Sequence, residues 1–197
     1  MTLGCEECAR DRERFVGIDE AAIEVVPATI EHWDLLAALF AGSKGVNTCW
    51  CMWPLRPPTA HQPGHDNNKA AMRSRLLDGE SPGLLALSEE RAVGWCACGP
   101  RHIYPQYESG NEGTTSWAIP CIYIDPAADR KAVAGALIRA ATELAVRNVA
   151  HAIEGPPPWW LPGDAKAIAV ATATFLENGF TQIGPGARMP ELRRVLA

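Results

Sequence analysis

The stretch WAIPCIYIDPAADRKAVAGALIRAATELAVR, residues 117–147, carries the clearest structural pattern in the chain. Its opening part, WAIPCIYI, is almost continuously apolar, which is typical of a central strand covered on both faces. Pro120 has no backbone N–H for a neighbouring strand, so it predicts a bulge or local splay. From Arg130 to Arg147 apolar residues recur at helical spacing. We therefore expect a strand, an Asp-Pro turn and a long helix.

Upstream of this stretch the pattern predicts a strand followed by two helices. AIEVVPA (22–28) is typical of a strand, and Thr29 can cap a helix that runs to about Phe40. The following segment, 45–66, is loop-like at its proline-rich end. A short helix should then start at Asn67 or Asn68 and close at Gly79.

A hairpin and a long loop are expected next. Two apolar runs within 83–99, separated by a Ser-Glu-Glu-Arg turn, predict an antiparallel hairpin. The segment 100–116 has no regular pattern, and loops of this length in compact domains are often binding loops.

The remainder of the chain continues the alternation of strands and helices. HAIEG (151–155) predicts a short strand, and Asp164 can cap a helix that ends at Gly179 in the left-handed conformation. FTQIG and LRRVL predict two final strands, with Phe175 and Leu176 among the buried residues of the preceding helix. The whole order predicts a mixed α/β sheet covered by helices.

Composition indicates a water-soluble protein of one domain. Residues 1–20 are charged and aperiodic, so we expect an irregular extension followed by a single domain over 21–197. A formal charge of −5 without a Lys/Arg cluster argues against nucleic-acid binding. The sequence has no membrane-spanning apolar run and no apolar signal segment, so we expect a cytoplasmic protein without membrane partners.

Seven cysteines in a chain without an export signal are expected to be reduced. A zinc site could form from Cys5 and Cys8 with Cys49 and Cys51, but the one-residue spacing of the second pair chelates poorly. Core packing is the favoured interpretation of Cys96, Cys98 and Cys121, and we expect no metal.

Three groups of motifs in this order of elements resemble the GNAT superfamily of acyl-CoA N-acyltransferases. IYIDPAADRKAVAGALI is similar to the family's strand, turn, pyrophosphate loop and helix, and FLENGF is similar to the end of its last long helix. CWCMW, NNKAAMR, PGLLAL, VGW and IEG resemble one bacterial subgroup. The resemblance spans residue 22 to the end. It implies a mostly antiparallel central sheet with splayed central strands and helices on both faces.

The resemblance also implies a function and a co-substrate. Members move an acyl group, most simply acetyl from acetyl-CoA, to an amine, here expected on a small molecule, and a homodimer is plausible by analogy. Backbone amides at a helix start can hold a pyrophosphate. The residues expected to do so are Asp129, Arg130, Lys131, Ala132, Val133 and Ala134.

Two of these positions depart from the family's glycine-rich pattern. Ala132 adds a methyl group where the phosphates approach, whereas Asp129 as an N-cap would occupy the same amides and repel the ligand. Arg130 and Lys131 can offset that charge. The alternative is a GNAT-like protein that has lost acyl transfer and either binds a small molecule or catalyses other chemistry.

The resemblance suggests roles for further residues. The backbone of Ile122, Tyr123 and Ile124 would bind the pantetheine arm. Phe175 stands where many members carry a proton-donating tyrosine, so Tyr104 is the first alternative donor. Glu154 is the candidate base, with His102 as runner-up.

The acceptor pocket is expected to be formed by residues from two loops. Arg101 and His102 follow the hairpin, and Trp159 and Trp160 lie in a proline-rich segment and could wall an apolar pocket. Packing of these tryptophans on the domain surface is an equally good interpretation.

Overall fold

The computed structural model describes residues 23–57, 65–105, 115–156, 165–183 and 191–196, and the structural statements below refer to these residues. Seven strands form one sheet in the order β1-β2-β3-β4-β5-β7-β6. All neighbouring strands are antiparallel except β4 and β5, which are parallel. The strands are β1 (Glu24–Pro27), β2 (Gly83–Ser88), β3 (Arg91–Pro100), β4 (Ser116–Ile124), β5 (Ala152–Glu154), β6 (Thr181–Ile183) and β7 (Glu191–Val195).

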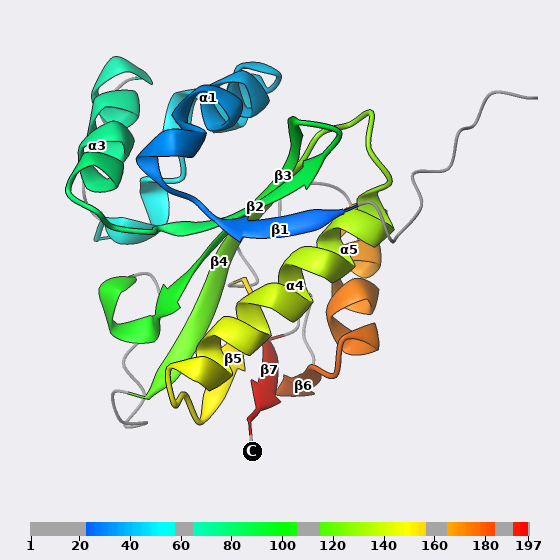
Figure 1. Cartoon of the computed structure of the whole chain (residues 1–197). Coiled ribbons are helices and arrows are strands. Elements are labelled where there is room, and N and C mark those ends of the chain that lie inside the picture. Colours follow the sequence, from blue (N-terminus) through cyan, green and yellow to red (C-terminus); the bar gives the residue numbers. More distant parts are fainter. Residues whose placement is uncertain (1–22, 58–64, 106–114, 157–164, 184–190, 197) are drawn as a thin grey trace, which may run out of the picture.

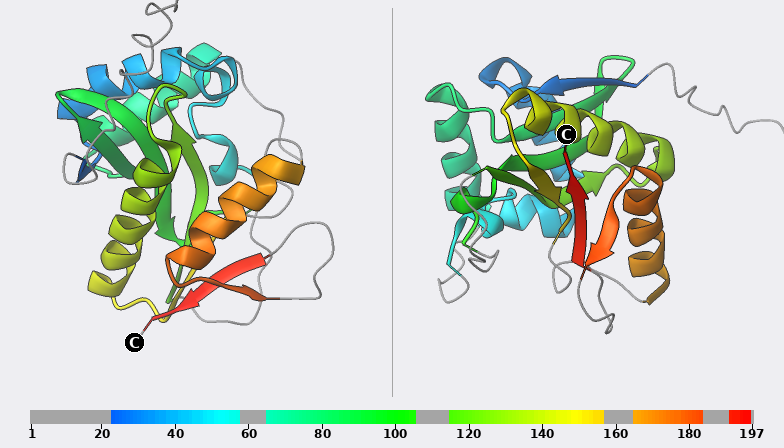
Figure 2. Two further views of the ribbon diagram at one scale, coloured as in Figure 1. Left: turned by 90° about the vertical axis from the view of Figure 1, so that its right-hand side faces the viewer. Right: turned by 90° about the horizontal axis from the view of Figure 1, so that it is seen from below.

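Helices cover both faces of this sheet, as Figures 1 and 2 show. One layer consists of α1 (Trp33–Ala41), α2 (Lys44–Cys49) and α3 (His65–Leu77), and it packs around Phe40 and Trp95. The other layer consists of α4 (Arg130–Arg147) and α5 (Ala165–Glu177). Short 3-10 turns are η2 (Ile30–His32), η3 (Trp53–Leu55) and η4 (Arg101–Ile103). The expected mixed sheet with helices on both faces is confirmed.

The central strand and its helix form as the sequence predicts. β4 is buried along most of its length, and α4 spans Arg130–Arg147. The register of β3 and β4 shifts at this point. Cys98 is the one β3 residue here, and β4 has two residues opposite it, Ile119 and Pro120. This is a β-bulge, and it confirms the irregularity predicted from Pro120.

The hairpin is also confirmed, with an unusual turn. β2 and β3 are joined by Glu89 and Glu90, whose φ angles are +48° and +62°. Two successive left-handed residues are the geometry of a type I′ turn, which usually takes Gly, because it has no Cβ, or Asn, whose short polar side chain tolerates the left-handed region.

One helix was missed, and two local predictions are wrong. Helix α2 was not expected; it begins after Ser43, whose hydroxyl accepts from the Val46 amide at 3.5 Å. Helix α3 begins at His65, so neither Asn67 nor Asn68 is its cap. Leu176 is 44 % exposed instead of buried, whereas Phe175 is buried and Gly179 is left-handed with φ +82°, as predicted.

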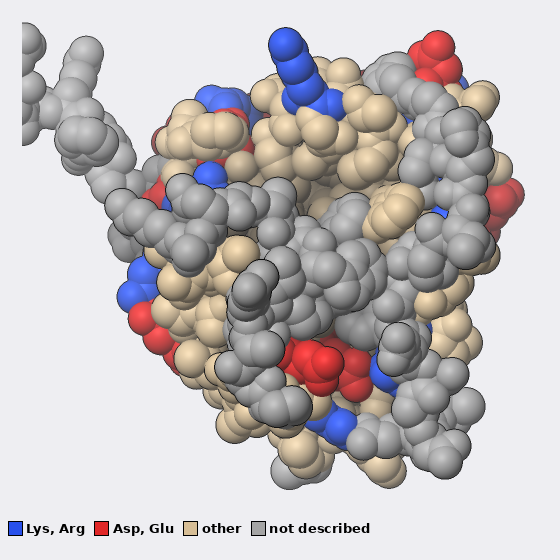
Figure 3. Space-filling model, turned by 180° about the vertical axis from the view of Figure 1, so that it is seen from behind, with Lys and Arg blue, Asp and Glu red and all other residues tan. Residues whose placement is uncertain are grey.

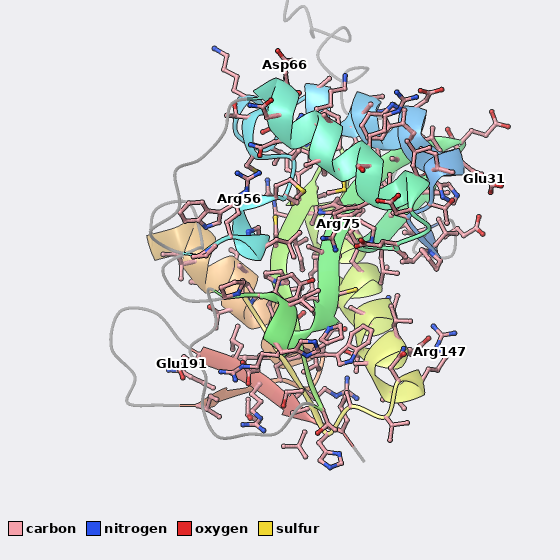
Figure 4. The ribbon with its side chains drawn as sticks, turned by 90° about the vertical axis from the view of Figure 1, so that its left-hand side faces the viewer. Glu31, Arg56, Asp66, Arg75, Arg147 and Glu191 are labelled. Carbon is pink, nitrogen blue, oxygen red and sulfur yellow. The ribbon has the colours of Figure 1, made fainter. Side chains whose placement is uncertain are left out.

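Asn68 explains why the start of α3 was misplaced. Its side chain is buried and bridges two other elements: Nδ2 donates to the Thr48 carbonyl at 2.9 Å, and Oδ1 accepts from Arg56 Nη2 at 2.8 Å. Arg56 lies beside the first turns of α3 in Figure 4. The asparagine therefore fixes α3 onto the α2 region through tertiary hydrogen bonds rather than capping the helix.

The surface carries both signs of charge. Figure 3 shows the face behind that of Figure 1, on which Lys and Arg are scattered among Asp and Glu rather than gathered in one patch. Among the described residues, no helix combines the length and apolarity needed to cross a membrane. The predicted extension 1–20, Asp164, and Cys5 and Cys8 lie outside the described residues.

Candidate functional site

The central strands separate within the sheet. β4 and β5 pair through three positions only, Ser116 with Ala152, Trp117 with Ile153 and Ala118 with Glu154. Beyond Ala118, β4 continues through the bulge to Ile124 without a further β5 partner among the described residues. The Asp125 amide donates to the Val93 carbonyl at 2.9 Å, so by the alternation of an antiparallel pair the Tyr123 backbone faces Trp95 of β3, which does not fit the predicted role of Tyr123. The backbone groups of Ile122 and Ile124 face the β5 side and have no β5 partner among the described residues, and the predicted splay is confirmed.

The start of α4 lies just beyond this open edge and carries the predicted N-cap. Asp129 Oδ1 accepts from the amides of Lys131 at 2.9 Å and Ala132 at 3.1 Å. The preceding turn is held by Asp125, whose carboxylate accepts from the Ala127 amide at 3.0 Å. Two of the amides at the helix start are thus already satisfied by an exposed carboxylate.

The cationic side chains at this end of α4 differ in their surroundings. Lys131 Nζ lies 3.0 Å from the Glu177 carboxylate at the end of α5, with both side chains largely exposed. Arg130 is exposed. Val133 and Ala134 are buried against the sheet, and the Val133 amide already donates to the Asp129 carbonyl at 3.0 Å.

Two predicted site residues meet where the strands separate. Glu154 ends β5 opposite Ala118, and its Oε2 accepts from Arg101 Nε at 2.9 Å. The side chains are 15 % and 19 % exposed, so the ion pair is shielded but reachable by solvent. Arg101 follows β3 directly in η4, so the pair links the two strands on either side of β4.

Two further predicted site residues, one in η4 and one directly after it, have opposite environments. His102 is exposed. Tyr104 is only 3 % exposed, and burial raises the pKa of its phenol well above the usual value, so the group keeps its proton. A Cβ added to Gly99 would lie 3.1 Å from the Tyr104 hydroxyl oxygen, which shows how closely the ring packs on the end of β3.

Phe175 lies in the core. Its ring meets Phe180 edge to face at 5.0 Å, within the cluster between the sheet and α4–α5. A proton donor at this position would therefore need a route to the surface.

Tyr123 has a feature that sequence reasoning missed. Its ring packs on the α1–α3 side with its centroid 6.4 Å from that of Phe40, and its buried hydroxyl has no hydrogen-bond partner among the residues that the structure describes. A Cβ added to Gly42 at the end of α1 would lie 3.8 Å from that oxygen. Nothing in the sequence distinguishes such a hydroxyl from an ordinary core tyrosine.

The remaining candidates fall in two groups. Trp159 and Trp160 lie outside the described residues. In the part of the chain that the structure describes, no group of three or more His, Cys, Asp or Glu side chains could hold a metal.

Comparison with solved structures shows which fold this is. The Salmonella typhimurium protein yncA, solved with its cofactor acetyl-CoA, is 16 % identical with a TM-score of 0.56, covering 89 % of this chain and 95 % of its own. Ribosomal-protein-alanine N-acetyltransferase from Brucella melitensis is 18 % identical with a TM-score of 0.55, covering 88 % and 99 %. AAC(6')-Ib in complex with ribostamycin and coenzyme A is 14 % identical with a TM-score of 0.58, covering 88 % and 93 %.

At these identities the likeness establishes the fold, and the expected GNAT fold is confirmed. No protein-family model and no curated protein matches the chain.

Proposed function

We propose that this chain, which has the fold of the GNAT acetyltransferases, is an acyl-CoA-dependent N-acyltransferase that acetylates an amine of a small molecule. The observation that carries the proposal is the opening of the sheet between β4 and β5. It leaves a strand edge, a helix start and a shielded carboxylate within one region of the fold. The structural relatives solved with acetyl-CoA or coenzyme A support the same ligand.

The chain's own groups suit an elongated, anionic thioester ligand. Backbone groups of Ile122 and Ile124, on the β5-facing edge of β4, would hydrogen-bond the amides of the pantetheine arm. The start of α4, with Arg130 and Lys131, would face the diphosphate. When bound, acetyl-CoA supplies an acetyl group activated as a thioester.

Glu154 is the proposed proton acceptor. As the amine nitrogen bonds to the carbonyl carbon and the carbon–sulfur bond breaks, the nitrogen must lose a proton, which Glu154 or a water it holds would take. Arg101 would orient the carboxylate by its hydrogen bond to Oε2. The thiolate leaves without a dedicated acid because a thiol has a pKa near 8.5.

A second candidate function is binding without transfer. It is favoured by the Asp129 carboxylate on the α4 amides and by Phe175, which removes the family's usual proton donor. Acceptor residues Arg101, His102, Trp159 and Trp160 would serve either function.

An activity assay distinguishes the two candidates. Purified protein is incubated with acetyl-CoA and a panel of polyamines, aminoglycosides and amino acids, and acetylated products are detected by mass spectrometry. We expect at least one acetylated amine, with turnover about 100-fold lower in Glu154→Gln and an unchanged Kd for acetyl-CoA. Glu191→Gln, at an exposed position at the start of β7, is the matched control and should behave as wild type. Tight acetyl-CoA binding without any product would instead support the binding protein.

A further inference from the structure

Two buried thiols from distant parts of the chain are in contact. Cys51 Sγ lies 3.0 Å from Cys121 Sγ, although 70 positions separate them in the sequence. Cys51 follows α2, and Cys121 lies on β4 beside the bulge. They are 3 % and 7 % exposed. Both belong to the buried cluster on the α1–α3 side of the sheet.

The backbone and a neighbouring ring hold Cys51 in this position. Trp50 and Cys51 have φ angles of +48° and +50°. Residues other than glycine rarely adopt this left-handed backbone conformation, and here two do so in succession. Trp95 Nε1 donates to Cys51 Sγ at 3.0 Å. Such unfavourable backbone conformations persist only where the surrounding structure holds them, and they cluster at functional sites.

A third thiol provides access to the pair. Cys49 is half-buried, and a hydrogen bond from the Cys51 side chain lowers the pKa of its thiol to about 7. Hydrogen bonding to Cys121 and Cys49, together with burial, raises the pKa of Cys51 well above the usual value. At neutral pH Cys49 is therefore substantially thiolate, the nucleophilic form, while Cys51 holds its proton.

We propose that Cys51 and Cys121 are an oxidisable dithiol that becomes a disulfide when the protein reacts with a hydroperoxide, with Cys49 as the thiol that reacts first. The proposal uses residues that acyl transfer does not require, so it does not rest on the proposed function. Metal binding is a weaker explanation because the described side chains provide no group of three ligands here.

The reaction balances in three steps. The Cys49 thiolate attacks one oxygen of ROOH, which gives a sulfenic acid and, with a proton from solvent, ROH. Cys51 attacks the Cys49 sulfur and water leaves. Cys121 then attacks the Cys51 sulfur and releases the Cys49 thiolate. In total, two thiols lose two electrons and two protons, and the hydroperoxide becomes an alcohol and water.

Peptide mapping tests the pairing directly. The reduced full-length chain is treated with hydrogen peroxide, remaining thiols are alkylated, and the protein is digested with trypsin. Because Arg56 precedes a proline, Cys49 and Cys51 share peptide 45–69, whereas Cys96 and Cys98 share 92–101 and Cys121 lies alone in 102–130. We expect a disulfide between 45–69 and 102–130.

Variants identify which thiol in 45–69 is bonded. Cys51→Ser and Cys121→Ser should lose the cross-link, and Cys98→Ser, also a buried thiol, should keep it. Cys49→Ser should keep it under diamide, a direct dithiol oxidant, but form it about tenfold more slowly with peroxide at pH 7. Where a variant fails to fold, the wild-type map still decides whether Cys121 is joined to peptide 45–69, and fragmentation of the linked peptides between Cys49 and Cys51 assigns the bonded thiol. A cross-link to 92–101, or free Cys121 under both oxidants, overturns the proposal.

Discussion

At the scale of single residues, Asp129 determines how well the start of α4 could hold a diphosphate. An N-cap hydrogen bond contributes about 1 kcal/mol, so a ligand that displaces the carboxylate loses about that much affinity. A unit charge about 5 Å from a dianion adds roughly 1 to 2 kcal/mol of repulsion in water. Together these effects reduce affinity about 100-fold, which weakens a site without removing it.

Asp129→Asn separates charge from capping, because asparagine caps as well as aspartate. We expect coenzyme A to bind about tenfold more tightly, measured by calorimetry, with little change in the free energy of unfolding. Glu143→Gln, which removes one charge from the exposed surface farther along the same helix, should leave the Kd unchanged. Equal tightening in both variants would mean that net charge, rather than this carboxylate, limits binding.

Replacing Tyr123 with phenylalanine should make the protein more stable. A buried hydroxyl without a partner costs about 1 to 3 kcal/mol, and this one has none within the described part of the chain. Tyr123→Phe should therefore raise the free energy of unfolding by about 1 kcal/mol in urea denaturation. Thr172→Val in α5 is the parallel case, because the described residues offer that buried hydroxyl no partner either. Destabilisation by Tyr123→Phe would show that its hydroxyl forms a bond in solution.

At the scale of elements, sequence prediction works where local signals decide the structure. The bounds of α4 follow from the Asp129 cap and a helical apolar stripe, and the bulge follows from the missing amide of Pro120. It fails where tertiary contacts decide. Asparagine is a residue type typical of helix caps, but the Asn68 side chain forms hydrogen bonds with Thr48 and Arg56 instead. No local sequence pattern indicates those partners.

Replacement of Asn68 tests this tertiary role. Asn68→Ala removes both bonds from a side chain that is 1 % exposed, so we expect a loss of about 2 kcal/mol from the free energy of unfolding. Asn67→Ala is a close control, because the neighbouring asparagine in the same helix is exposed and should change stability by less than about 0.5 kcal/mol. Similar losses for the two variants would contradict the bridging role.

At the scale of the whole molecule, β4 and β5 can separate because few positions join the sheet half formed by β1–β4 to the half formed by β5–β7. β4 and β5 share three paired positions, and this parallel junction connects β1–β4 with β5–β7. Family resemblance predicted the opening; strand patterns alone did not, because the pairing length of a strand depends on its partner. The pairing of Arg101 with Glu154 was equally hidden, since the residues are 53 positions apart.

A ligand in this opening should stabilise the entire fold, because it would contact the edge of β4 and the start of α4 together. At 100 times its Kd, acetyl-CoA adds about 2.7 kcal/mol to the free energy of unfolding. For a chain of this size, that corresponds to roughly 5 to 10 °C in Tm, measured by differential scanning fluorimetry. Pantetheine, which lacks the diphosphate, should raise Tm by less than acetyl-CoA does at equal concentration. In an Arg130→Gln variant the Tm shifts with the two ligands should differ by less than they do in the wild type. An unchanged Tm at millimolar acetyl-CoA would contradict a thioester site between β4 and β5 and leave the fold without its proposed co-substrate.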